Sequence, residues 1–393
     1  MRSSIRCVSP LAVCFAAAVA CACGSNRTAA TSSTSAATAP ASSASAAEVS
    51  PAAAPSGSAV VVSVTHAGAD HGPARLTGTA IPLPGAEAPA SLDYIAYERA
   101  RSRVWVPVSS AGAVDVLDIA TGRFTPVDGF TTAEREVRGK KRTMGPSAVT
   151  PGESVVYVGD RASNQVCPVD ATTLRVGPCL TLPSPTDGVA YVESAHEVWV
   201  TTPGDQALAV LDASKPGALK AKATVKTDGA PEGYAVDDAR GLFFTNLEDK
   251  GGTLVIDVKT RKVQATWNPR CGADGPRGLA FDAVHDFVIV ACTDHLQVLD
   301  AAHDGALLGT LDTGAGVDNI DVLNGVVYVA AARAARLTVA VVDDRGELTV
   351  EATGDTAEGA RNAVADAQGN VYVPDPKAAR LLVFAAPERP PRP

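Results

Sequence analysis

Short apolar runs and turn residues alternate along most of this 393-residue chain. The clearest unit is 275–300, GPRGLAFDAVHDFVIVACTDHLQVLD, which contains three apolar runs separated by turns. Runs of this length that are rich in valine and aromatic residues are typical of β-strands, and clusters of Asp, Gly and Thr are typical of turns. No amphipathic stretch in the body of the chain is long enough for a helix. The pattern therefore predicts an all-β fold.

The same unit occurs seven times. Its reference residue in 275–300 follows Gly-Pro and precedes Gly-Leu-Ala-Phe-Asp. The equivalent residues of the seven copies are Asp93, Ser147, Asp187, Glu232, Arg277, Asp318 and Arg361. Their spacings are 54, 40, 45, 45, 41 and 43 residues, and the blades of a β-propeller repeat at roughly 40–50 residues. The chain is therefore predicted to form a seven-bladed β-propeller.

The seventh copy stops before its fourth strand. It has apolar runs at 362–366, 370–375 and 381–385 and then continues as PERPPRP. Upstream of the first copy, 76–84 (LTGTAIPLP) has the pattern of a strand without a partner. We predict that this N-terminal strand completes the last blade and closes the ring, which leaves no unpaired edge. The alternative is a disordered strand, as chain termini often are.

Four copies share a short motif before a third strand that ends in Asp. The motifs are VYVGD at 156–160, FFTN at 243–246, VYVA at 327–330 and VYV at 371–373. These features resemble the YVTN-type seven-bladed β-propellers, a family of mostly bacterial exported repeat proteins. The resemblance covers about residues 76–386, and no copy carries the full Tyr-Val-Thr-Asn signature. It implies a fold, whereas function on this scaffold has to be argued from a site.

Residues 1–23 are predicted to be a targeting segment. Two arginines precede a short apolar run at 11–20, which is too short to span a bilayer as a helix. The run leads into ACACGS, and small residues before a cysteine that is followed by Gly-Ser resemble a bacterial lipoprotein signal. Cys23 is the predicted acylated residue and Cys21 the alternative. An ordinary secretory signal with incidental cysteines is the other interpretation.

Residues 24–73 are rich in Ala, Ser, Thr and Pro and have little to bury, so we predict a disordered tether before a propeller at 74–390. A basic insertion at 131–144 (TTAEREVRGKKRTM) separates blades 1 and 2 and explains the long first spacing. It is expected on the face where the blades connect to each other. It is either an arm that attracts an anionic ligand or partner or a solvated loop.

These segments predict export to a bacterial cell envelope, as an outer-membrane lipoprotein or a periplasmic protein. The Gly-Ser after Cys23 favours the outer membrane, by resemblance to Gram-negative lipoproteins. The net charge of −9 and the absence of a basic domain argue against nucleic acid. The expected partners are an unknown envelope protein or a small anionic ligand, the membrane is reached through the lipid anchor, and a monomer is expected.

Four cysteines remain in the predicted mature domain. An even number in an exported protein suggests disulfides, although sequence alone allows three connectivities. Cys271 and Cys292 are expected as neighbours on one face of blade 5, and Cys167 and Cys179 on adjacent strands of blade 2, so we predict these two pairs. The absence of a C-x-x-C pair argues against a Cys₄ metal site.

The repeat register gathers polar residues at one end of the central channel. The first strand of each propeller blade lines the channel, and the residue that begins it lies on the face where propellers usually bind ligands. The predicted ligand-binding residues are Asp93, Ser147, Asp187, Glu232, Asn246, Arg277, Asp318, Asn319, Arg361 and Asn362. The second-to-third loops are expected to surround them with Asp160, Arg161, Thr202, Asn246, Glu248, Asp249, Asp294, His295 and Asp375. These groups form a polar binding site or pair with each other and plug the channel.

Two functions would use this end of the channel, the channel mouth. The first is a non-catalytic binding module with no cofactor, no metal and no catalytic residue. The alternative is a metal-dependent lactonase, a gluconolactonase-like hydrolase or lyase that would hold Ca²⁺ or another divalent cation. Its candidate ligands are Asp187, Glu232, Asn246, Asp318 and Asn319. Lactonase motifs are not recognisable in the chain, the nearby arginines would oppose a divalent cation, and His295 alone among the histidines is expected at the mouth, so the first function is favoured.

Overall fold

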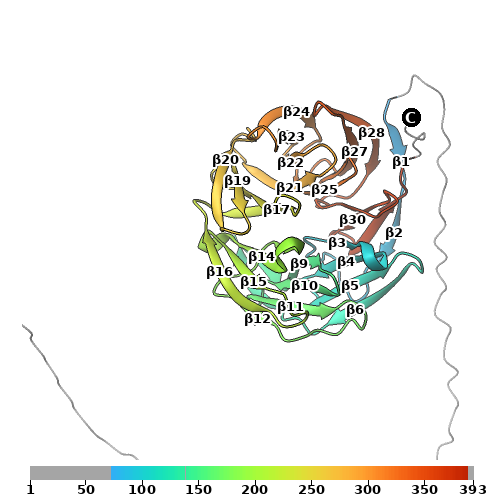
Figure 1. Cartoon of the computed structure of the whole chain (residues 1–393). Coiled ribbons are helices and arrows are strands. Elements are labelled where there is room, and N and C mark those ends of the chain that lie inside the picture. The colour runs from blue at the N-terminus through green and yellow to red at the C-terminus, as the bar shows by residue number, and fades with distance from the viewer. Residues whose placement is uncertain (1–71, 138, 388–393) are drawn as a thin grey trace, which may run out of the picture. The chain divides into compact units, whose positions relative to one another are not determined.

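The computed structural model describes residues 72–137 and 139–387, which form seven β-sheets in a ring (Figure 1). The predicted all-β, seven-bladed β-propeller is thus confirmed. The predicted targeting segment 1–23, with Cys23, lies outside the described residues, as does the predicted tether except for its last two residues. Helical structure within the described ranges consists of three single 3₁₀ turns, η1 (Arg99–Arg101), η2 (Glu193–Ala195) and η3 (Pro203–Asp205).

Each blade is an antiparallel sheet whose strands follow one another outward from the channel. The innermost strands are β3 (Ala96–Glu98), β9 (Pro146–Pro151), β13 (Val189–Val192), β17 (Pro231–Asp237), β21 (Pro276–Asp282), β25 (Val317–Leu323) and β29 (Val364–Ala365). The second strands are β4 (Arg103–Val108), β10 (Val155–Asp160), β14 (Glu197–Thr202), β18 (Leu242–Leu247), β22 (Phe287–Cys292), β26 (Val326–Ala331) and β30 (Val371–Asp375). The third strands are β5 (Ala113–Asp118), β11 (Gln165–Asp170), β15 (Ala207–Asp212), β19 (Gly252–Asp257), β23 (His295–Asp300), β27 (Arg336–Val342) and β31 (Arg380–Phe384). The outermost strands are β6 (Arg123–Asp128), β12 (Leu180–Thr181), β16 (Lys220–Lys226), β20 (Lys262–Trp267), β24 (Ala306–Asp312), β28 (Leu348–Asp355) and, for blade 7, β2 (Gly78–Pro82).

The N-terminal segment closes the ring, as predicted. Strand β2 pairs antiparallel with β31 over five residues and so completes blade 7. Strand β1 (Ala74–Leu76) adds a contact that the sequence did not predict, because it pairs parallel with β28 at the edge of blade 6 (Figure 1). A side chain at Gly78 would meet the Phe384 ring at 2.8 Å, so glycine permits the close approach of β2 to blade 7. The segment therefore ties the outer edges of two blades together.

Apolar side chains pack between neighbouring blades rather than in one central core. Trp199 of blade 3 stacks on Phe243 of blade 4 with ring centroids 4.7 Å apart, and both are fully buried. The Trp199 indole N–H donates to Glu197 Oε2 at 2.8 Å, so the buried nitrogen has a hydrogen-bond partner. Burying 150–250 Å² of an aromatic side chain contributes about 4–6 kcal/mol before entropy costs. The interfaces between blades thus hold the ring together around the channel.

The repeated Asp at the end of the third strand has a structural role. Its carboxylate accepts hydrogen bonds from backbone N–H groups in the turn toward the fourth strand, which is a common way for Asp to favour turns. The residues that do so are Asp118, Asp170, Asp212, Asp257, Asp300 and Asp343. These acids form turns and do not belong to a binding site.

Both predicted disulfides are present, Cys167–Cys179 in blade 2 and Cys271–Cys292 in blade 5. Disulfides persist in oxidising compartments, so they indicate a location outside the cytoplasm. No helix within the described residues is long and apolar enough to cross a membrane.

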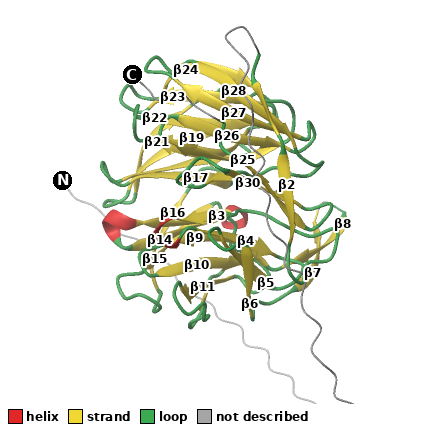
Figure 2. Ribbon diagram, turned by 90° about the vertical axis from the view of Figure 1, so that its right-hand side faces the viewer, coloured by secondary structure: helices red, strands yellow, loops and turns green. Residues whose placement is uncertain are grey.

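The basic insertion forms a two-stranded hairpin, β7 (Ala133–Val137) and β8 (Lys140–Met144), at the right-hand edge of Figure 2. It contacts the loop between β10 and β11, since Arg135 donates to the Ala162 carbonyl at 2.9 Å. The backbone N–H of Thr131 donates to Asp160 Oδ2 at 3.0 Å. The second-to-third strand loops lie at the end of the channel where the site was predicted, so the hairpin stands beside that end.

Candidate functional site

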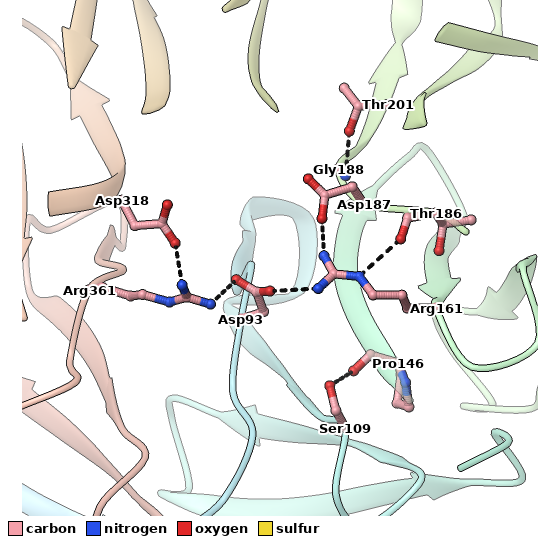
Figure 3. Close-up of polar contacts among 10 residues, drawn as sticks. All are labelled: Asp93, Ser109, Pro146, Arg161, Thr186, Asp187, Gly188, Thr201, Asp318 and Arg361. Carbon is pink, nitrogen blue, oxygen red and sulfur yellow. Dashed lines mark hydrogen bonds and ion pairs between the residues drawn. The ribbon is translucent and has the colours of Figure 1, made fainter. Parts of the chain in front are cut away.

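Five of the charged residues at the channel mouth form one continuous chain of ion pairs (Figure 3). Arg161 contacts Asp187 with one guanidinium nitrogen and lies 3.6 Å from Asp93 Oδ2 with the other. Arg361 lies 3.1 Å from Asp93 Oδ1 and 3.0 Å from Asp318 Oδ2. The structure therefore brings together residues from blades 1, 2, 3, 6 and 7, as the register predicts.

Each of these ion pairs joins residues of neighbouring blades. Ser147 occupies the repeat position of blade 2 and carries no charge, and Arg161 from the β10–β11 loop of the same blade supplies one. On the other side, Arg277 of blade 5 pairs with Glu248, which follows β18 in blade 4. Glu232, between them in blade 4, makes no hydrogen bond or ion pair with another described residue. A carboxyl group without a partner thus lies beside the ion-pair chain.

A ring of seven positions cannot alternate in charge all the way round. Taken in blade order, with Arg161 in the place of Ser147, the charges alternate except at one point, where the acids Asp187 and Glu232 are neighbours. The charged groups in this order are Asp93, Arg161, Asp187, Glu232, Arg277, Asp318 and Arg361. Between blades 3 and 4 the mouth therefore has two neighbouring acids with no basic group between them.

The pKa values of the mouth acids reflect this arrangement. Burial, together with the negative charges of Asp187, Asp318 and other acids, raises the pKa of Glu232 from 4.5 to about 9. Burial raises the pKa of Asp187 to about 6, although Arg161 opposes the shift. The pKa of Asp318 is raised by burial and held back by Arg361. Glu232 is therefore protonated at neutral pH in the free protein and titrates together with its neighbours.

Several buried polar atoms at the mouth lack a hydrogen-bond partner among the described residues. They are Ser147 Oγ, Thr186 Oγ1, Asp187 Oδ2 and both polar side-chain atoms of Asn362, which is 2% exposed. Most buried polar atoms in proteins are hydrogen-bonded, and leaving one without a partner costs about 1–3 kcal/mol. These atoms are candidates for contact with a ligand.

Two predicted site residues have other contacts. Asn246 is fully buried, donates to the Arg277 and Gly278 carbonyls at 2.6 and 3.2 Å, and accepts from Thr253 Oγ1 at 2.6 Å. Its side chain joins blade 4 to blade 5, so its role is structural and it does not belong to the proposed site. Asn319 packs over Gly278, and a side chain at position 278 would collide with Asn319. Asn319 also lines the channel below the mouth.

The alternative metal set does not have the geometry of a cation site. Asp187 and Asp318 each pair with a different arginine, and Asn246 uses its amide between the blades. The described part of the chain contains no group of three or more His, Cys, Asp or Glu residues placed to hold a metal. A hard divalent cation needs several oxygen ligands converging on one point, and the five candidate residues do not supply them.

Two tyrosines close the mouth from below. Tyr94 of blade 1 and Tyr234 of blade 4 stack with ring centroids 6.1 Å apart, although they come from widely separated blades. The Tyr234 hydroxyl donates to the Val189 carbonyl at 2.6 Å, and Gly188 leaves room for its ring, because a side chain there would approach it to 2.5 Å. Burial and the charge of Glu232 raise the pKa of Tyr94, which places this ring next to the mouth acids.

Comparison with known proteins shows the fold. No family model matches the chain, and no curated protein matches its sequence. A solved structure of hydrazine synthase from Kuenenia stuttgartiensis matches with 14% identity and a TM-score of 0.63, over 77% of this chain and 96% of that chain. Virginiamycin B lyase from Staphylococcus aureus matches with 10% identity and a TM-score of 0.62, over 79% and 100%. The WD40 repeats of RRP9 match with 10% identity and a TM-score of 0.63, over 78% and 97%. At these identities the likeness extends to the propeller fold alone.

Proposed function

We propose that this protein is an exported, lipid-anchored β-propeller that binds a positively charged group at the mouth of its channel. The observation that carries the proposal is the break in charge alternation between Asp187 and Glu232. An ammonium or guanidinium group bound there would complete the alternating ring, giving Glu232 a partner and Asp187 a second one through its Oδ2 atom.

The charge balance of the mouth supports a cation over an anion. Five acidic side chains face three guanidinium groups. With Glu232 protonated at neutral pH the excess is one negative charge, and it becomes two when Glu232 ionises beside a bound cation. The groups are Asp93, Asp187, Glu232, Glu248 and Asp318 against Arg161, Arg277 and Arg361. Because Arg161, Arg277 and Arg361 each already have a carboxylate partner, none of these three is free for the small anionic ligand that the sequence suggested.

A guanidinium or ammonium at the end of a side chain fits this site best. The tyrosine pair makes the site shallow, so it would accept the tip of a group rather than a whole molecule. A guanidinium could donate to Asp187 Oδ2 and to Glu232 at the same time, and hydrogen bonds to charged groups contribute about 1.5–3 kcal/mol each. The ligand is therefore an arginine or lysine side chain presented by an envelope protein, and the propeller is a binding module.

The two disulfides support export, and the N-terminal sequence supports the lipid anchor. It is tested by metabolic labelling of the full chain with a palmitate analogue in a bacterial host. We expect label in the wild type and in Cys21→Ala, and none in Cys23→Ala. Equal labelling of Cys23→Ala would contradict Cys23 as the anchor.

The binding part is tested by calorimetric titration of the full chain with Nα-acetyl-L-arginine amide at pH 8 and low salt. Nα-acetyl-L-citrulline amide is the matched control ligand, because its ureido group has nearly the same shape without the charge. We expect the arginine compound to bind at least about tenfold more tightly, and Glu232→Gln to weaken its binding by about 10–100-fold. Glu347→Gln, which alters an exposed acid at the β27–β28 connection on the opposite face of the ring, should change nothing. Equal affinity for the two compounds would refute the proposal.

A further inference from the structure

A cavity of about 400 Å³ lies in the channel below the tyrosine pair. All seven innermost strands line it, and its lining includes Tyr234 of the pair but none of the ion-paired mouth residues. It continues to Arg99 and Leu323, which lie at first-to-second strand connections. The cavity is therefore lined by residues other than the ion-paired ones of the mouth, and it extends toward the opposite face of the ring.

The volume of the cavity is that of a small-molecule site. Aliphatic residues from all seven blades line it, and Tyr97, Tyr191, Tyr234 and Phe281 are among its lining residues. Sites for small ligands are clefts of roughly 300–1,000 Å³ in which a few placed polar groups orient the ligand. The cavity falls within this range.

Asp321 is the one acidic side chain in the lining of the cavity. One of its carboxylate oxygens accepts from the backbone N–H of Val322 and the other from that of Ala365, each at 2.8 Å. These bonds fix the carboxylate and leave each oxygen a further lone pair for a ligand. Burial raises the pKa of Asp321 to about 6, against the effect of the two N–H groups and of Arg99, so the group is ionised at neutral pH.

Arg99 is the one basic side chain in the lining. It belongs to η1, directly after β3, and is exposed. Its guanidinium forms no hydrogen bond or ion pair with another described residue, although it is close enough to Asp321 to influence the pKa of that acid. A carboxylate and a guanidinium thus face one cavity without contacting each other.

We propose that this cavity binds a zwitterionic α-amino acid with an aromatic or other apolar side chain. The ammonium group would donate to Asp321, the carboxylate would accept from Arg99, and the side chain would lie against Tyr97, Tyr191 or Phe281. Each charged group of the ligand would then meet an opposite charge that lacks an ion-pair partner in the free protein. The site goes beyond the cation site at the mouth and does not depend on it.

The proposal is tested by titrating L-phenylalanine into the full chain at pH 7.5. Two control compounds each lack one charge: 2-phenylethylamine lacks the carboxylate and 3-phenylpropanoate lacks the ammonium group. We expect L-phenylalanine to bind about tenfold or more tightly than either compound. Absence of saturable binding of L-phenylalanine at millimolar concentration would overturn the proposal.

Two variants each remove one of the two charged groups of the proposed cavity site. Arg99→Met should weaken L-phenylalanine binding about tenfold or more and leave 2-phenylethylamine unaffected, whereas Asp321→Asn should weaken both. Arg123→Met, at an exposed arginine on β6, is the matched control and should have no effect. Because Arg99 is exposed, its variant keeps the fold and decides the question even if Asp321→Asn does not fold. Unchanged L-phenylalanine affinity in Arg99→Met overturns the assignment.

The two sites are distinguished by Glu232→Gln. This change alters the mouth above the tyrosine pair and should leave L-phenylalanine binding unchanged. If Glu232→Gln abolishes that binding, the amino acid binds at the mouth and the cavity proposal fails, while the cation proposal stands.

Discussion

Glu232 should make the stability of the propeller fall as the pH rises, and Glu232→Gln should remove this effect. The pKa of Glu232 is about 9 in the folded protein, chiefly because of burial, and 4.5 ordinarily. Between these values the folded protein holds a proton that the unfolded chain has released. Because the unfolded state binds fewer protons, the free energy of unfolding decreases with pH across this window.

The size of the effect follows from the two pKa values. A difference of one bound proton between the folded and unfolded states changes the free energy of unfolding by about 1.4 kcal/mol per pH unit. Between pH 6 and pH 8 the wild type should therefore lose about 3 kcal/mol through this group. The neutral amide of Glu232→Gln keeps the shape of the side chain and has no proton to release. The variant should gain stability relative to the wild type by about 3 kcal/mol over the same interval.

Urea unfolding at pH 6, 7 and 8, followed by tryptophan fluorescence with the disulfides oxidised, measures this difference. Glu347→Gln is the control, because it removes an exposed carboxyl group. Its profile should run parallel to that of the wild type. If the profile of Glu232→Gln also runs parallel to the wild type, Glu232 is ionised in the free protein and the reasoning about the mouth is wrong.

Three further predictions concern the scaffold and the site. Asn246→Ala should destabilise the protein by about 2–4 kcal/mol in urea, because it leaves two backbone carbonyls between blades 4 and 5 without their donor; a loss below about 0.5 kcal/mol would contradict this role. Replacing both Cys271 and Cys292 by Ser should cost about 3 kcal/mol, from the loop of 21 residues that the disulfide closes, and an unchanged urea midpoint would disagree. EDTA or added Ca²⁺ should leave the melting temperature unchanged, since ligand binding raises the apparent stability of the native state; a calcium-dependent rise would restore the metal-dependent alternative.

The fold was predictable because each blade repeats the same local pattern. Alternating apolar strands and an Asp before each outer turn, as at Asp257 and Asp300, identify the register without any long-range information. The parallel pairing of β1 could not be predicted, because three residues carry no recognisable pattern. The hairpin at 133–144 also escaped prediction, since its strands are charged and lack apolar alternation.

The positions of the mouth residues could be predicted from the sequence, but their ion-pair partners could not. The register placed the acids at the mouth, because a repeat fixes where each backbone lies. The partners of Arg161 depend on how a long side chain reaches across to neighbouring blades. Asn246 turns toward blade 5 because a register shift between Pro276 and Leu279 leaves carbonyls there outside the strand ladder. The place of Asp321 in a cavity depends on the width of the channel, which no local pattern gives.

The most direct test of the central claim is proton release on cation binding. Nα-acetyl-L-arginine amide is titrated calorimetrically into the full chain at pH 7 in two buffers that differ in ionisation enthalpy. A cation beside Glu232 favours its ionised form, so binding should release close to one proton in the wild type and none in Glu232→Gln. Binding with no proton release, or with the same release in the variant, would show that the cation does not bind between Asp187 and Glu232.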